Sequence, residues 1–134
     1  MTAKVIYQGD LRTVATHLRS GTAIETDAPV DNKGKGERFS PTDLLATSLA
    51  TCILTTMGIA GNTHSINIDG TECGVEKIMA ADPRRVAEIK IAIRFPKNNS
   101  YSDKEKVLLE RIAHTCPVAI SLHPDMKQTL SFNW

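Results

Sequence analysis

Three cysteines are the residues in this chain best suited to chemistry. Cys116 directly precedes Pro117, and this step predicts that Cys116 caps a short helix, where backbone N–H groups and the helix dipole favour a thiolate. Cys52 lies in a long uncharged segment, where burial would raise its thiol pKa, so a reactive Cys52 needs a cationic partner. Cys73 has no special neighbours and is interpreted as a small hydrophobic residue. Taken singly, each thiol also fits a structural role.

No other motif competes with the thiols. The chain has no G-x-S-x-G nucleophile elbow, no phosphate-binding loop, and no Cys-x-x-Cys or Cys/His cluster at zinc spacing. Arg12, Arg19 and Arg38 are the candidate cations for Cys52. The sequence alone does not show that Cys52 and Cys116 meet.

Cys52 is positioned by a predicted helix from Pro41 to Ala60, closed by the Gly61-Asn62 pair. Ser40 and Asp43 form a short capping box, and Pro41 suits the first helical position. No charged residue follows Asp43 until Asp69, so the helix is uncharged around its circumference and must be covered on all sides. Its many Thr and Ser residues and its glycines argue against a membrane span.

Strand and helix patterns surround this segment. Val86–Phe95 alternates apolar and polar residues, which indicates a strand with one face in the core. The other predicted strands are Val5–Gln8, Leu11–His17, Thr22–Thr26, Ser65–Asp69, Val75–Ala81 and Gln128–Trp134, and the other helices are Ser102–Thr115 and Pro117–Leu122. This order predicts an α+β fold with antiparallel sheet packed on one long central buried helix.

Length and composition restrict the function classes. The 134 residues suggest a single domain over 1–134, and 41% hydrophobic with 23% charged residues is ordinary for a soluble globular protein. A net charge of +1 gives no reason to expect nucleic acid or an anionic membrane as a partner. An odd cysteine count, with no apolar run near Met1, favours a cytoplasmic protein with reduced thiols.

Two motifs together resemble a known family. The stretch Ser40–Cys52 and the triplet Cys116-Pro117-Val118, whose cysteines lie 64 positions apart, are similar to the signatures of the OsmC/Ohr family of osmotically inducible and organic hydroperoxide resistance proteins. The resemblance covers essentially the whole chain. It implies an OsmC-like fold, an intertwined homodimer with active sites at the subunit interface, and no metal or other cofactor.

The resemblance also implies an activity, a thiol-dependent reduction of organic hydroperoxides. Cys52 would match the peroxidatic cysteine and Cys116 the resolving cysteine, with an external dithiol reducing the disulfide. Arg19 best matches the family's early arginine, and Arg38 is the alternative beside the helix start. The alternative reading is a non-enzymatic dimer that binds a small apolar ligand or senses redox state.

One position departs from the family pattern. The peroxidase branches carry a Glu ten residues before the reactive cysteine, and this chain has Thr42 there, with Asp43 one step later. Asp43 is shorter and already caps the helix. The departure places the chain in an OsmC-like branch without the usual Glu.

Overall fold

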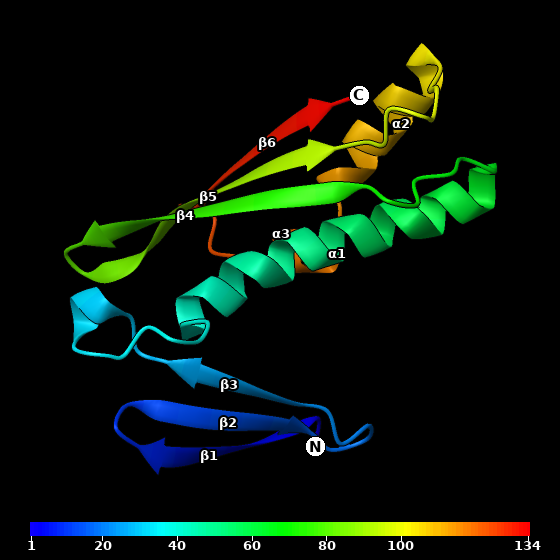
Figure 1. Cartoon of the computed structure of the whole chain (residues 1–134). Coiled ribbons are helices and arrows are strands. Elements are labelled where there is room, and N and C mark those ends of the chain that lie inside the picture. Colours follow the sequence, from blue (N-terminus) through cyan, green and yellow to red (C-terminus); the bar gives the residue numbers. More distant parts are fainter. The chain divides into compact units, whose positions relative to one another are not determined.

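The computed structural model describes all 134 residues, and they form two compact units, Met1–Leu45 and Ala46–Trp134 (Figure 1). The long helix α1, Pro41–His64, begins in the first unit and continues in the second. The expectation of a single domain over 1–134 stays a prediction.

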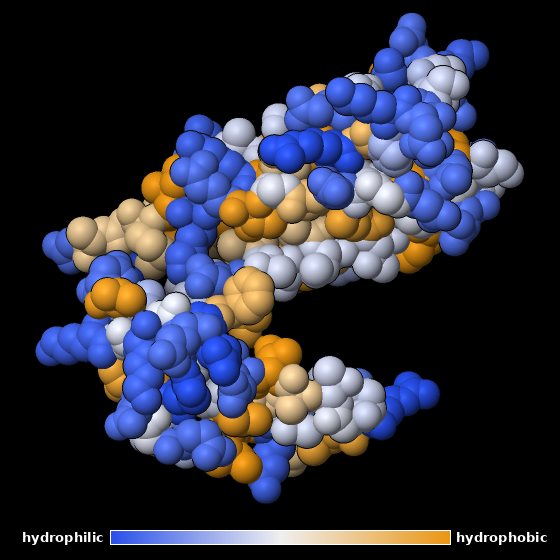
Figure 2. Space-filling model, viewed as in Figure 1, coloured by the Kyte–Doolittle hydropathy of each residue, from blue (hydrophilic) through white to orange (hydrophobic).

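The N-terminal unit is a three-stranded antiparallel meander of β1 (Ala3–Gly9), β2 (Arg12–His17) and β3 (Ala23–Asp27). The predicted hairpins are confirmed. A 3₁₀ turn, η1 (Val30–Asn32), follows β3 in the segment that leads to α1. Several large apolar side chains of this sheet are exposed, and apolar residues reach the surface of the unit in Figure 2. The sheet therefore buries little of its own apolar area.

The predicted cap of α1 is confirmed. The Asp43 N–H donates to Ser40 Oγ at 3.1 Å, and the Ser40 N–H donates to the Asp43 carboxylate at 2.7 Å. These two bonds satisfy backbone donors that a helix start otherwise leaves unpaired.

The predicted end of α1 is wrong, because the helix runs through Gly61 to His64. A Cβ at Gly61 would lie 2.6 Å from the carbonyl oxygen of Ile66, whose N–H donates to the Gly61 carbonyl at 2.8 Å. Gly61 thus permits close chain approach, and Ser65, with a φ of 57°, turns the chain. The predicted strand at Ser65–Asp69 is also wrong, since this segment is irregular and the strand begins at Glu72.

The second unit contains a sheet in the order β4 (Glu72–Ala81), β5 (Arg84–Arg94) and β6 (Lys127–Asn133). β4 and β5 are antiparallel, as expected, but β6 runs parallel to β5. Parallel neighbours need a long crossover connection, and here the connection contains α2 (Asp103–Ala113) and α3 (Pro117–Ser121).

The core of this unit combines one face of β5 with helical residues. Ile89, Ile91 and Ile93 on β5 are at most 1% exposed, which confirms the predicted alternation. Leu49, Ile53 and Met57 of α1 and Leu109 of α2 are fully buried as well. The predicted capping box of α2, Ser102 with Glu105, is present.

Within the second unit, α1 is covered on one side. Its buried residues recur at helical spacing, whereas Thr51, Thr55 and Ile59 form an exposed stripe, and Ile59 is 63% exposed. By length and composition alone α1 could cross a membrane, which is also true of many core helices in soluble proteins. The exposed stripe carries no charged side chain.

Candidate functional site

Helices α1 and α3 bring two thiols together. Cys52 lies in the fourth turn of α1 and is half-buried, and Cys116 is the N-cap residue of α3 and is fully buried. The two thiols are free, and they are close enough for Cys52 to raise the pKa of Cys116. The pairing joins positions that are far apart in the sequence, and it places two reduced thiols beside one another.

The predicted helix cap at Cys116 is confirmed. Cys116 has an extended backbone with φ −67° and ψ 146°, and Pro117 occupies the first helical position. The Ala119 N–H donates to Cys116 Sγ at 3.3 Å. The sulfur thus takes the place that a Ser or Asp oxygen usually has at a helix start.

Opposing influences act on the Cys116 thiol. Burial raises its pKa, and the neighbouring Cys52 thiol raises it further, whereas the backbone N–H groups of Ala119 and Val118 lower it. The net direction is upward. Cys116 therefore stays protonated beside Cys52, which is the arrangement expected of a second thiol that acts after the first.

Cys73 lies outside this pair. It is on the edge strand β4 opposite Ile93, and burial alone raises its thiol pKa, with no contribution from either of the other cysteines. Its interpretation as a structural residue is consistent with this environment.

The two arginines predicted as partners of Cys52 lie in the N-terminal unit. Arg19 is exposed in the turn between β2 and β3. Arg38 is about half exposed, and its Nε donates to the Glu25 carboxylate at 2.7 Å. Their roles as partners of the thiol stay predictions.

Arg12, the third candidate, is at the centre of an ion-pair cluster that sequence reasoning did not find. It donates from two nitrogens to the Asp27 carboxylate, at 2.7 and 2.8 Å, and to Glu37 at 2.8 Å. Asp27 is 1% exposed, and the guanidinium holds the pKa of its carboxyl below the usual range. The cluster connects β2 to the last residue of β3 and to Glu37, which lies in the segment between β3 and α1. The sequence could have indicated this ion pair through the pairing of β2 with β3, because Arg12 and Asp27 are direct cross-strand neighbours.

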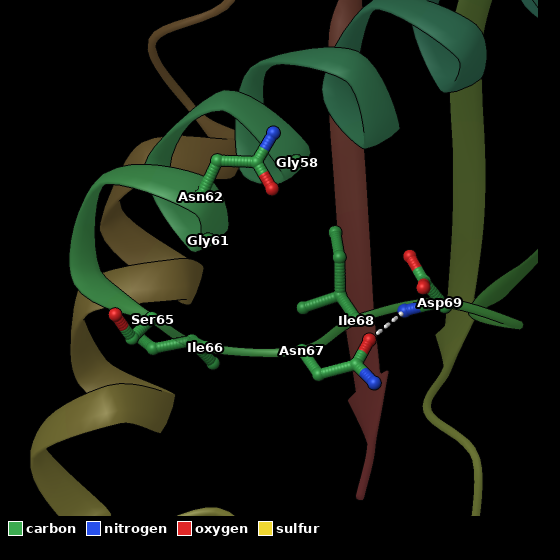
Figure 3. A pocket seen from close by; sticks show the side chains of 8 residues that line it. All are labelled: Gly58, Gly61, Asn62, Ser65, Ile66, Asn67, Ile68 and Asp69. Atoms are coloured by element: carbon green, nitrogen blue, oxygen red, sulfur yellow. Dashed lines mark hydrogen bonds between the residues drawn. The ribbon is translucent and has the colours of Figure 1, made fainter.

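Two surface hollows in the second unit contain no thiol. One, of about 380 Å³, lies at the end of α1, and Figure 3 shows Asn67 folding back so that its side-chain oxygen accepts the Asp69 N–H at 2.8 Å. Its polar side chains are exposed. The other, of about 410 Å³, lies on the outer face of the β4–β5–β6 sheet, over the small residues Gly74, Ala92 and Ser131. No group of His, Cys, Asp and Glu side chains is arranged to hold a metal ion.

Fold and thiol pair together define an α+β protein with a dithiol site between two helices. Comparison with protein families agrees with this class, because the model described as OsmC-like protein matches residues 34–131, a range that includes both thiols. The chain belongs to this OsmC-like family.

Solved structures show the same fold. A protein from Psychrobacter arcticus 273-4, provisionally named an osmotic stress induced and detoxification response protein, is 57% identical, with a TM-score of 0.95 over 99% of this chain and 96% of that one. The organic hydroperoxide resistance protein OsmC of Legionella pneumophila is 17% identical, with a TM-score of 0.75 over 100% of this chain and 98% of that one. OhrB of Bacillus subtilis is also 17% identical, with a TM-score of 0.68 over 99% and 98%. A comparison with curated protein sequences finds no match.

Proposed function

We propose that this protein is a thiol-dependent hydroperoxide reductase that prefers organic hydroperoxides. The observation that carries the proposal is the contact between the Cys52 and Cys116 thiols, which come from separate helices and lie in a half-buried site. Family membership supports it, as do structural neighbours that are named organic hydroperoxide resistance proteins.

The reaction has two oxidative steps. The Cys52 thiolate attacks the O–O bond, takes one oxygen as a sulfenic acid, and releases an alkoxide that is protonated to an alcohol. The Cys116 thiol then condenses with the sulfenic acid, forming the Cys52–Cys116 disulfide and water. Cys116 already lies beside Cys52, so the second step needs little movement.

A cation must support the Cys52 thiolate, because Cys52 lies well inside α1 and far from the positive end of the helix. We assign this role to Arg19, with Arg38 as the alternative. A dithiol from outside the protein restores the two thiols. The chemistry requires no metal or organic cofactor, and reduced thiols at rest suit a cytoplasmic location.

The active unit in this proposal is a homodimer. The uncharged, exposed stripe of Thr51, Thr55 and Ile59 on α1 supports it. The exposed apolar residues Val5 and Tyr7 of the N-terminal sheet give further support. A second copy of the chain would cover such surfaces, which a monomer would leave in water.

The test is turnover of cumene hydroperoxide with a dithiol reductant. Wild type and Cys73→Ser should turn over alike. Cys52→Ser should be inactive, and Cys116→Ser should consume about one equivalent per site and then stop. If wild type is no faster than Cys52→Ser with several hydroperoxides and dithiols, the reductase proposal fails and a ligand-binding or redox-sensing dimer replaces it.

A further inference from the structure

The two sulfurs of the dithiol differ in access. Cys116, the N-cap residue of α3, is 0% exposed within a single chain, and association with a second chain can only cover surface further. Cys52 is only half-buried. A thiolate that opens a disulfide must reach one sulfur along the S–S axis, and its choice depends on access as well as on the leaving thiol.

We propose that the external dithiol opens the disulfide by attacking Cys52, and that Cys116 is the leaving sulfur. This inference rests on the proposed function, since it concerns the disulfide formed there. The incoming thiolate forms a new S–S bond with Cys52, the Cys52–Cys116 bond breaks, and its electron pair goes to Cys116, which then takes a proton. The second thiol of the reductant attacks the mixed disulfide and releases the Cys52 thiolate.

Helix α3 is built to receive the leaving sulfur. Cys116 Sγ accepts the Ala119 N–H at 3.3 Å in the reduced state, and a disulfide sulfur is a weaker acceptor than a thiolate. Release of Cys116 therefore restores a bond that the disulfide weakens. Burial opposes the charge, and these backbone donors offset part of that cost.

Gln128 on β6 holds α3 in place. Its Nε2 donates to the Ala119 carbonyl at 2.9 Å, and α3 itself has no buried residue. This bond joins the short helix to the sheet and so orients the donors that face Cys116. Gln128 is therefore a positioning residue: it acts through α3 in the reductive half of the reaction and does not touch the reacting sulfurs.

Attack at the opposite sulfur has one advantage and one obstacle. Cys52 would be the more solvated leaving group, which favours attack at Cys116. The obstacle is that Cys116 is 0% exposed, so the protein would have to open locally before a thiol could reach this sulfur. We expect the accessibility of the attacked sulfur to outweigh the stability of the leaving thiolate. No exchange occurs unless the incoming thiolate can approach along the S–S axis.

The experiment traps the mixed disulfide in the Cys73→Ser background. The protein is oxidised with cumene hydroperoxide, or separately with diamide, treated briefly with the monothiol 2-mercaptoethanol, quenched in acid and mapped by mass spectrometry. The adduct is expected on Cys52. An adduct mainly on Cys116 overturns the inference while the reductase proposal stands. If only diamide forms the disulfide, the reductase proposal fails, and the adduct still decides which sulfur is attacked; if neither oxidant forms it, both fail.

A matched pair of variants tests the role of α3. Gln128→Met should slow reduction of the disulfide by about fivefold, the effect of losing one hydrogen bond, with an unchanged rate of the first peroxide attack. Thr129→Val is the control, since Thr129 bonds Glu88 on the other face of β6, and both rates should stay at the wild-type value. Equal reduction rates for the two variants would overturn the positioning role of Gln128.

Discussion

Replacing Cys116 by alanine or by serine separates its structural role from its chemical role. Both changes remove the second thiol, so neither variant can form the disulfide. They differ at the start of α3, where Cys116 Sγ accepts the Ala119 N–H. A serine oxygen is a good N-cap acceptor, and an alanine offers no acceptor at all.

The helix cap determines how much the two variants should differ in their free energy of unfolding. Loss of an N-cap costs about 1 kcal/mol of the free energy of unfolding, and alanine also removes one buried sulfur, worth about as much again. Serine keeps an acceptor for the cap and loses only part of the free energy that burial of the sulfur contributes. We therefore expect Cys116→Ala to be less stable than Cys116→Ser by about 1 kcal/mol, which is a melting temperature about 3 to 5 °C lower.

The assay is thermal or urea unfolding under reducing conditions at one protein concentration, because association would otherwise shift the midpoint. Trp134 is a suitable fluorescent probe, since it stacks on Phe95 with ring centroids 3.9 Å apart. Cys73 supplies the control: it lies in strand β4 and caps no helix, so serine there should give no advantage over alanine. Equal stability of Cys116→Ala and Cys116→Ser would show that the sulfur does not act as a stabilising cap of α3.

Three further predictions concern assembly, charge and pH. Sedimentation at micromolar concentration should show a dimer, and a 14.6 kDa species alone would contradict the proposed homodimer. Arg19→Ala should slow the first attack on peroxide sharply; if only Arg38→Ala or Arg12→Ala does so, the assignment to Arg19 is wrong. Arg12 lowers the pKa of Asp27 in the fold, so the pair stabilises the protein above the ordinary carboxyl pKa, and this contribution is lost as pH falls through the folded value. Asp27→Asn should therefore flatten the fall in unfolding free energy as the pH drops below the ordinary carboxyl pKa, and an unchanged slope would count against the ion pair.

The features predicted from the sequence are those that local chemistry determines. The Ser40–Asp43 cap, the alternation of β5 and the N-cap at Cys116 each depend on residues within a few positions of one another. The family motifs added the pairing of Cys52 with Cys116, which periodicity could not supply.

The features that were missed depend on contacts between distant segments. Gly61 looked like a helix stop, although it is needed for close contact with Ile66. The parallel placement of β6 depends on how the chain crosses through α2 and α3, and alternation within a strand carries no information on direction. Gln128 was predicted only as part of a strand, because its bond to Ala119 joins segments that no local pattern connects.

Disulfide mapping after one equivalent of organic hydroperoxide tests the central claim most directly. Reduced wild-type protein is treated with cumene hydroperoxide in the absence of dithiol, alkylated and analysed by mass spectrometry. We expect a Cys52–Cys116 disulfide within one chain, one equivalent of alcohol per site, and an alkylated Cys73. A disulfide that includes Cys73, or peroxide that remains unconsumed while Cys52 and Cys116 are both alkylated, would contradict it.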